Sequence, residues 1–91
     1  MINWDKYDKR LVGLVKLKDL VFDENGHPGG INEGYTSKGY IDLTETKKHN
    51  CLFIQDHSRW FHTSIVVKQI ECGGYDLLQT LNSVYKIEFI K

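Results

Sequence analysis

The stretch DHSRWFHTS (56–64) gathers side chains that could hold a ligand. The guanidinium of Arg59 forms forked hydrogen bonds with phosphate or carboxylate groups. The ring of Trp60 provides a flat surface for stacking a base or a cation. The two histidines donate or accept hydrogen bonds near neutral pH, and the hydroxyl groups add donors. The candidate ligand-binding set is His57, Arg59, Trp60, His62, Thr63 and Ser64.

The alternation of a β-strand decides which of these side chains face outward. Neighbouring residues of a strand point to opposite sides, so either Trp60 or Phe61 points inward. If Phe61 lies in the core, Trp60, His62 and Ser64 share the outer or partner-facing side. Arg59 and Thr63 then share the side of Phe61, unless Arg59 belongs to the turn. A third possibility is that Trp60 lies at a subunit contact, because Trp and Arg are favoured at the centres of interfaces.

The segment DENGHPGGINEGYTSKGY (23–40) holds five of the eight glycines and the only proline. We interpret it as one long loop. Structureless loops of this length are usually functional or disordered. Such a loop could close over a ligand through Gly29, Gly30 and Asn32, or it could be a hairpin tip under which Trp60 packs.

Metal binding and catalysis have weaker support in the sequence. Among the soft metal ligands, His57 and His62 have a spacing that could suit a structural zinc site, whereas His49 and Cys51 do not, although they would share a face of a strand. Scattered surface histidines and buried thiols explain the pattern better, so we expect no metal. No nucleophile elbow or phosphate-loop motif is present, and paired carboxylates such as Asp56 with Glu45 or Glu71 carry little weight. We therefore expect a binding protein that is not an enzyme and has no cofactor. The soft ligands are His49, Cys51, His57, His62 and Cys72.

The pattern along the chain predicts a single all-β domain (1–91). Short apolar stretches alternate with polar or glycine-rich turns, which is typical of a meander. The expected architecture is a small SH3-like or partly open five- to six-stranded barrel with the long loop 23–40. A helical turn is expected within 3–10. The expected strands are 11–22, 39–45, 51–55, 59–71, 76–81 and 84–90, with polar turns at 46–50 and 56–58.

Two of these strands show the alternation with different clarity. In VYKIEFI (84–90), apolar and charged residues alternate throughout. In LVKLK (14–18), they also alternate, as in a strand with one solvent-exposed face, although a helical face competes in this region. An open sheet would leave unpaired edges, so we also expect pairing between subunits.

Charge and composition limit the classes of partner. Lys and Arg together number 12, as do Asp and Glu, giving a formal net charge of +0. This balance argues against broad electrostatic binding to nucleic acid. The N-terminus lacks the apolar core of a secretory signal, and no stretch is long enough to cross a bilayer. We expect a cytoplasmic protein in which Cys51 and Cys72 are reduced.

The C-terminal third follows the pattern W-x-x-T-S-x-V and then T-x-N-S-x-Y-x-[IL]. The matching residues are Trp60, Thr63, Ser64, Val66, Thr80, Asn82, Ser83, Tyr85 and Ile87. Over residues 60–89 the chain resembles small phage and prophage β-proteins. Some such proteins are counter-defence sponges that oligomerise and sequester host nucleotide immune signals. The resemblance thus implies a phage-encoded protein, expressed in the host cytoplasm.

These observations lead to a ranked set of functions. The first is non-enzymatic binding or sequestration of a nucleotide-like or phosphate-bearing small molecule by a homo-oligomer. The second is a protein-interaction module that binds and inhibits a host protein. The third is an SH3-like nucleic-acid-associated module, against which the zero net charge counts. A structural virion component is the last.

Overall fold

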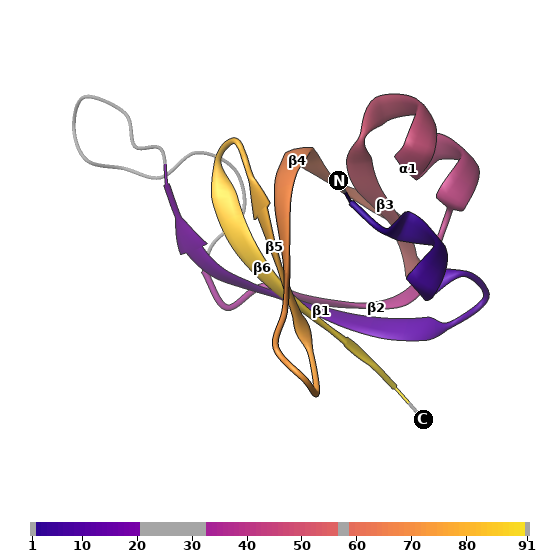
Figure 1. Ribbon diagram of the computed structural model, residues 1–91, viewed down its shortest axis with the longest axis horizontal. Helices are drawn as coiled ribbons and strands as arrows, with labels where there is room; N and C mark the ends of the chain where they lie inside the picture. Colours follow the sequence, from indigo (N-terminus) through magenta and orange to yellow (C-terminus); the bar gives the residue numbers. More distant parts are fainter. Residues whose placement is uncertain (1, 21–32, 57–58, 91) are drawn as a thin grey trace.

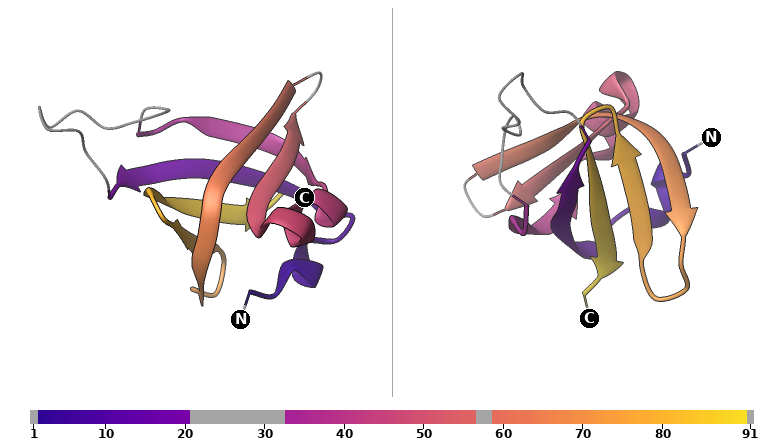
Figure 2. Two further views of the ribbon diagram at one scale, coloured as in Figure 1. Left: turned by 90° about the horizontal axis from the view of Figure 1, so that it is seen from above. Right: turned by 90° about the vertical axis from the view of Figure 1, so that its left-hand side faces the viewer.

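Six antiparallel strands form a closed barrel (Figure 1). The computed structural model describes residues 2–20, 33–56 and 59–90. Every strand pairs with its neighbours in sequence, and β1 and β6 pair to close the ring (Figure 2). The predicted small all-β meander is confirmed. The strands are β1 (Leu11–Asp19), β2 (Thr36–Ile41), β3 (Cys51–Asp56), β4 (Arg59–Glu71), β5 (Asp76–Thr80) and β6 (Ser83–Phe89).

Because the barrel is closed, the reason for expecting subunits to pair through an open sheet edge no longer holds. Each strand now has a hydrogen-bonded neighbour on both sides, so the six strands form no open sheet. The expected association of subunits was based on such an edge. It stays a prediction, and it must now be argued from side chains rather than from unpaired main-chain groups.

The core lies inside the barrel and is completed by the N-terminal segment. Inward residues of the strands pack around Leu52, Ile54 and Leu78, which are almost completely buried. A short 3-10 helix, η1 (Trp4–Tyr7), adds two rings to this core at one end of the barrel. The expected helical turn within 3–10 is therefore present. Among the described residues, no helix has the length and apolar character needed to span a membrane.

Alternation predicts β6 correctly but fails in β1. Tyr85 and Ile87 are buried, as the sequence of β6 indicates. In β1, however, Lys16 is only 1% exposed, whereas Leu17 is 43% exposed. Lys16 continues the inward series of Val12 and Leu14, and the register shift that follows it leaves both Leu17 and Lys18 exposed. The expected solvent-exposed position of Lys16 is wrong.

A short helix, α1 (Leu43–His49), replaces part of an expected strand and an expected turn. The strand expected at 39–45 ends at Ile41, and the turn expected at 46–50 is mostly helical. Asp42 caps the helix by accepting a hydrogen bond from the backbone N–H of Glu45 at 3.1 Å. Asn50 ends it with a left-handed backbone, φ 55°. In Figure 1, α1 lies beside η1.

Part of the loop expected at 23–40 is a strand. Residues 36–40 belong to β2, where they pair with β1. Residues 23–32 lie outside the described part of the chain. The strand expected at 59–71 is confirmed as β4, which pairs first with β3 and then with β5.

Candidate functional site

Four ring-bearing side chains lie on the outer wall of the barrel, where β2, β3 and β4 are neighbours. Tyr40 lies opposite Gln55, and Gln55 lies opposite Trp60, so one row of residues crosses three strands. In the next row, Phe53 lies opposite His62. We call Tyr40, Phe53, Trp60 and His62 the aromatic face.

Two rings of this face are highly accessible, whereas Phe53 is partly buried. Tyr40 is 57% exposed and Trp60 is 54% exposed. Isolated apolar residues on a surface are ordinary, but a group of large ones on one face is informative. The ring of Phe53 stacks on that of His62, with centroids 5.2 Å apart and planes inclined by 21°. The imidazole of His49 lies 5.5 Å from Phe53 and extends the array.

His62 has a defined hydrogen-bonding character. Its Nδ1 lies 3.2 Å from the carbonyl oxygen of Thr63. A carbonyl oxygen only accepts, so in the neutral ring Nδ1 carries the proton and Nε2 is an acceptor. The exposed imidazole therefore presents an acceptor when neutral and a donor when protonated.

Gly39 brings β2 close enough to β3 to place Tyr40 in the row. A Cβ atom built at this position would lie 1.8 Å from the carbonyl oxygen of Gln55. Real Cβ contacts are never that short, so any other residue would push the two strands apart. The position of Tyr40 beside Gln55 thus depends on the missing side chain of Gly39.

The helix α1 and its C-terminal residue support β3 and β4 from one end. Thr46 is fully buried, and its hydroxyl oxygen accepts the backbone N–H of Phe53 at 3.0 Å. The side chain of Asn50 donates to the carbonyl oxygen of Val66 at 3.0 Å. The backbone N–H of Val66 donates in turn to the carbonyl oxygen of Asn50 at 2.8 Å. These bonds fix the strands that carry the aromatic face.

The residues predicted from the sequence have different positions. Arg59, Trp60 and His62 are exposed. Ser64 is partly buried, and its hydroxyl oxygen accepts a hydrogen bond from the side chain of Asn82 at 2.6 Å. The structure therefore places the indole and one imidazole of the predicted set on the same side of β4, whereas Arg59 directly precedes Trp60 and by alternation belongs to the side of Phe61. The predicted residues His57, Gly29, Gly30 and Asn32 lie outside the described residues.

Thr63 lies on the inner side of β4, where the alternation with Phe61 as a core residue places it. It is only 3% exposed. Its hydroxyl accepts the backbone N–H of Leu52 at 3.0 Å and donates to the carbonyl oxygen of Ser64 at 2.8 Å. Both bonds satisfy backbone groups at the register shift between β3 and β4. We therefore leave Thr63 out of the candidate site.

Sequence reasoning missed Tyr40 and Phe53. Each belongs to a strand or loop that the sequence analysis did not connect with Trp60. Alternation with the buried Ile41 and Ile54 could have placed both rings on an outer surface. Their proximity to Trp60 depends on the register of three strands, which no local pattern specifies.

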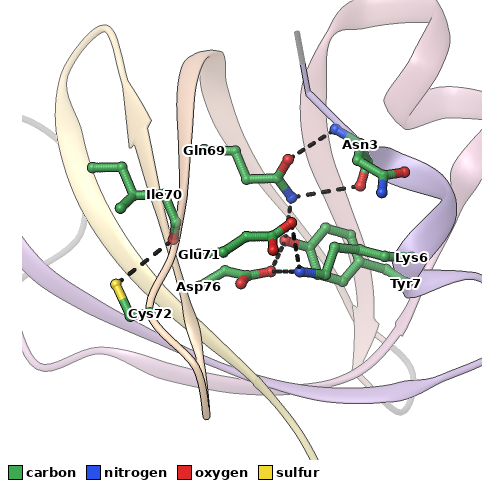
Figure 3. Close-up of polar contacts among 8 residues, drawn as sticks. All are labelled: Asn3, Lys6, Tyr7, Gln69, Ile70, Glu71, Cys72 and Asp76. Carbon is green, nitrogen blue, oxygen red and sulfur yellow. Dashed lines mark hydrogen bonds and ion pairs between the residues drawn. The ribbon is translucent and has the colours of Figure 1, made fainter.

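A second group of polar side chains joins η1 to the hairpin of β4 and β5 (Figure 3). The hydroxyl of Tyr7 donates to Oδ2 of Asp76 at 2.7 Å and accepts from Nε2 of Gln69 at 2.8 Å. Nζ of Lys6 lies 2.8 Å from the same Oδ2 and 3.3 Å from Oε1 of Glu71. We call Asn3, Lys6, Tyr7, Gln69, Glu71 and Asp76 the N-terminal clasp.

The electrostatics of the N-terminal clasp favour the proton-bearing forms of its donors. Burial, with a further contribution from Asp76, raises the pKa of Tyr7 well above its ordinary value of 10.0. The hydrogen bond to Asp76 raises the pKa of Lys6 above 10.5, although burial opposes this. Tyr7 is thus a neutral hydrogen-bond donor, not a base or nucleophile. A cavity of about 50 Å³ adjoins it, bordered by Gly73 and Gly74.

A buried ion pair lies on β1. Nζ of Lys16 contacts Oδ1 of Asp19, and both side chains are at most 2% exposed. The other carboxylate oxygen of Asp19, Oδ2, is buried and has no hydrogen-bond partner among the described residues. Removing either partner of this ion pair would leave an uncompensated charge in the interior, which strongly destabilises a folded protein.

Among the described residues, no group of three or more His, Cys, Asp or Glu side chains could hold a metal ion. Cys51 and Cys72 are both free thiols. Burial raises the pKa of Cys51, which lowers the fraction of reactive thiolate.

Comparison with family models, with curated proteins and with solved structures found no match. The resemblance of residues 60–89 to phage proteins therefore stays a prediction. The case for function depends on the geometry of the chain itself.

Proposed function

We propose that the protein binds a nucleotide-like, phosphate-bearing ligand on its aromatic face, without chemical conversion. The observation that carries the proposal is the row from Tyr40 to Trp60, in which two rings more than half exposed flank one amide side chain. Rings presented in this way stack with the faces of bases.

Each group on and beside the aromatic face has a role in this proposal. Trp60 stacks with a base, and Tyr40 provides a second ring. Arg59, which precedes Trp60 at the start of β4 and is exposed, pairs with a phosphate group. His62 accepts a hydrogen bond through Nε2 when it is neutral. Stacking and charge pairing hold a ligand in place, and they transfer no proton or chemical group.

The phage resemblance suggests a biological role for such binding. A small phage protein that retains a nucleotide immune signal would act as a counter-defence sponge. The proposed role needs tight binding and slow release, which rigid rings favour because little side-chain freedom is lost on binding. Native mass spectrometry with cyclic and linear nucleotides would report the subunit number and any retained ligand together.

Calorimetric titration with a panel of mononucleotides and cyclic dinucleotides tests the proposed site. We expect Trp60→Ala to weaken binding at least about fivefold, because stacking of one base contributes about 1–3 kcal/mol. Trp60→Phe keeps a ring and should retain most of the affinity. Tyr75→Ala is the matched control, since Tyr75 is 38% exposed but lies at the turn between β4 and β5. Equal losses for Trp60→Ala and Tyr75→Ala would contradict the proposal.

A second candidate function is protein binding, which one observation favours. Ile65, Val67 and Leu81 are 44%, 51% and 56% exposed. Ile65 and Val67 also border a shallow groove with Ile2. Such aliphatic surfaces fit a protein partner better than a nucleotide. Substitution of Val67 by Lys should abolish a stoichiometric protein complex while leaving nucleotide binding unchanged.

A further inference from the structure

We infer that the ligand of the aromatic face is a single-stranded nucleic-acid segment of several nucleotides, rather than one isolated nucleotide. The inference rests on the proposed function and specifies its ligand class. It depends on three observations: the separation of the rings, their position on the outer wall, and the positive side chains beside them.

The rings are too far apart to serve one base. Tyr40 and Trp60 lie in the same row but are separated by β3. Because neighbouring strands are about 4.8 Å apart, the two backbones are separated by about 10 Å. The pair of Phe53 and His62 lies one row away, about 7 Å along the strands. One base covers one ring, so three ring positions accommodate successive bases of a strand.

The position of the rings also favours an extended ligand. Small ligands are generally held in concave sites that bury most of their surface. Tyr40 and Trp60 retain exposures of 57% and 54%, so they stand on an outer wall and do not line an enclosed cavity. A single nucleotide lying there would bury one face of its base. A strand that crosses β4, β3 and β2 gains a further contact with each base.

One cation lies on the same side as this path, and a second, exposed cation is the neighbour of Trp60 in the chain. Arg59 precedes Trp60 on β4, and Lys38 lies two residues before Tyr40 on the same side of β2. The nearby carboxylate of Asp56 accepts hydrogen bonds from the hydroxyl of Ser37 and the backbone N–H of Lys38. Two cations suit two phosphates at most. The zero net charge of the chain counts against binding that is mainly electrostatic, so the inferred binding depends on stacking.

Dominant stacking with at most two phosphate contacts predicts that affinity depends only weakly on salt concentration. For single strands, the logarithm of affinity falls by roughly 0.7 per neutralised phosphate for each tenfold rise in salt. Two phosphates give a slope of about −1.4, which is roughly a sevenfold loss between 50 and 200 mM salt. A protein that binds mainly by charge would lose far more.

The test compares thymidine monophosphate with oligothymidylates of two, four and eight nucleotides and with an eight-base-pair duplex. Binding is measured by fluorescence anisotropy for labelled strands and by calorimetry for the mononucleotide. We expect affinity to rise at least tenfold from one to four nucleotides and then to level off. The duplex should bind weakly, because its bases stack on one another. Tyr40→Ala and Trp60→Ala should each weaken binding of the tetranucleotide at least about fivefold, whereas Tyr75→Ala should not.

The outcomes separate this inference from the proposed function. If the mononucleotide binds as tightly as the tetranucleotide and Trp60→Ala weakens both, the proposed function stands and the inference is overturned. If no nucleotide binds at any length, both fail. Sedimentation velocity of the same samples supplies a third outcome. If Trp60→Ala alters only the self-association of the protein, the aromatic face is a protein interface and the inference is wrong.

Discussion

The N-terminal clasp and the aromatic face both combine rings with polar groups, yet they differ in what those groups contact. In the N-terminal clasp, the hydroxyl of Tyr7 and the carboxylate of Asp76 are buried and bond to one another. On the aromatic face, Tyr40 and Trp60 leave more than half of their surface exposed. Polar groups that satisfy one another hold a fold together, whereas exposed rings remain available to a ligand. We therefore expect the first region to contribute stability, and the proposed ligand contacts lie in the second.

The largest expected effect comes from removing the central carboxylate of the N-terminal clasp. Asp76→Ala leaves the buried hydroxyl of Tyr7 without its acceptor and Lys6 without its closest partner. We expect a loss of about 3 kcal/mol in the free energy of unfolding, measured by urea denaturation. Binding by the folded protein should be unchanged. Glu71→Ala removes the other carboxylate near Lys6. The side chain of Glu71 is 65% exposed, so its loss should cost less than about 1 kcal/mol in the free energy of unfolding.

A smaller effect is expected where the aromatic face depends on its backbone. Gly39→Ala places a Cβ atom against the carbonyl oxygen of Gln55. Overpacking of this kind typically costs about 1–3 kcal/mol, and it should also weaken binding by moving Tyr40. Gly74→Ala is the control, because a Cβ atom there meets no atom within 4 Å. Similar stability for the two variants would show that β2 does not need the close approach.

The alkaline limit of stability should depend on the N-terminal clasp. The pKa of Tyr7 is raised in the folded protein from its ordinary value of 10.0. As the pH rises past 10, the unfolded chain therefore releases this proton first, and the folded state loses stability relative to it. The stability is fully present below pH 10 and is lost above it, by up to about 1.4 kcal/mol per pH unit for one group.

Tyr7→Phe isolates that contribution. The variant is less stable at neutral pH because it lacks the hydrogen bond, but its stability should fall less steeply above pH 10. Some slope remains, because the pKa values of Lys6 and Tyr85 are also raised. Urea denaturation at pH 9, 10 and 11 measures both slopes. Parallel curves for the variant and the parent would mean that Tyr7 does not titrate as its burial requires.

Local patterns were sufficient for most of the fold. The alternation in β6 and the glycine or polar residues between strands predict the meander, because each depends on neighbours in sequence. The position of Lys16 was not predicted from the alternation of apolar and charged residues, since Lys16 continues the inward series of Val12 and Leu14 and pairs with Asp19 three residues later. The helix α1 left a usable signal that was missed: Asp42 followed by Glu45, a common helix start.

The candidate site was predicted only in part for a related reason. Alternation about Phe61 as a core residue places Trp60 and His62 outside, and both are exposed. Tyr40 joins them through pairings that connect residues 40, 55 and 60 across two strand boundaries. Register of this kind is set by the packing of the whole barrel and by Gly39, so a single stretch of sequence does not contain it.

The smallest expected change in stability is also the sharpest test of the comparison. Trp60→Ala removes the larger ring from the aromatic face, but it empties no buried site, because Trp60 is 54% exposed. Its free energy of unfolding should stay within about 0.5 kcal/mol of the parent. Trp4→Ala is the matched control, since Trp4 is 6% exposed and its Nε1 donates to Oδ1 of Asn50. Thermal unfolding should separate the two variants clearly, whereas ligand binding should be weakened only for Trp60→Ala. If Trp60→Ala destabilised the barrel as strongly as Trp4→Ala, the exposed indole would be a structural residue, and the division between stability and binding would fail.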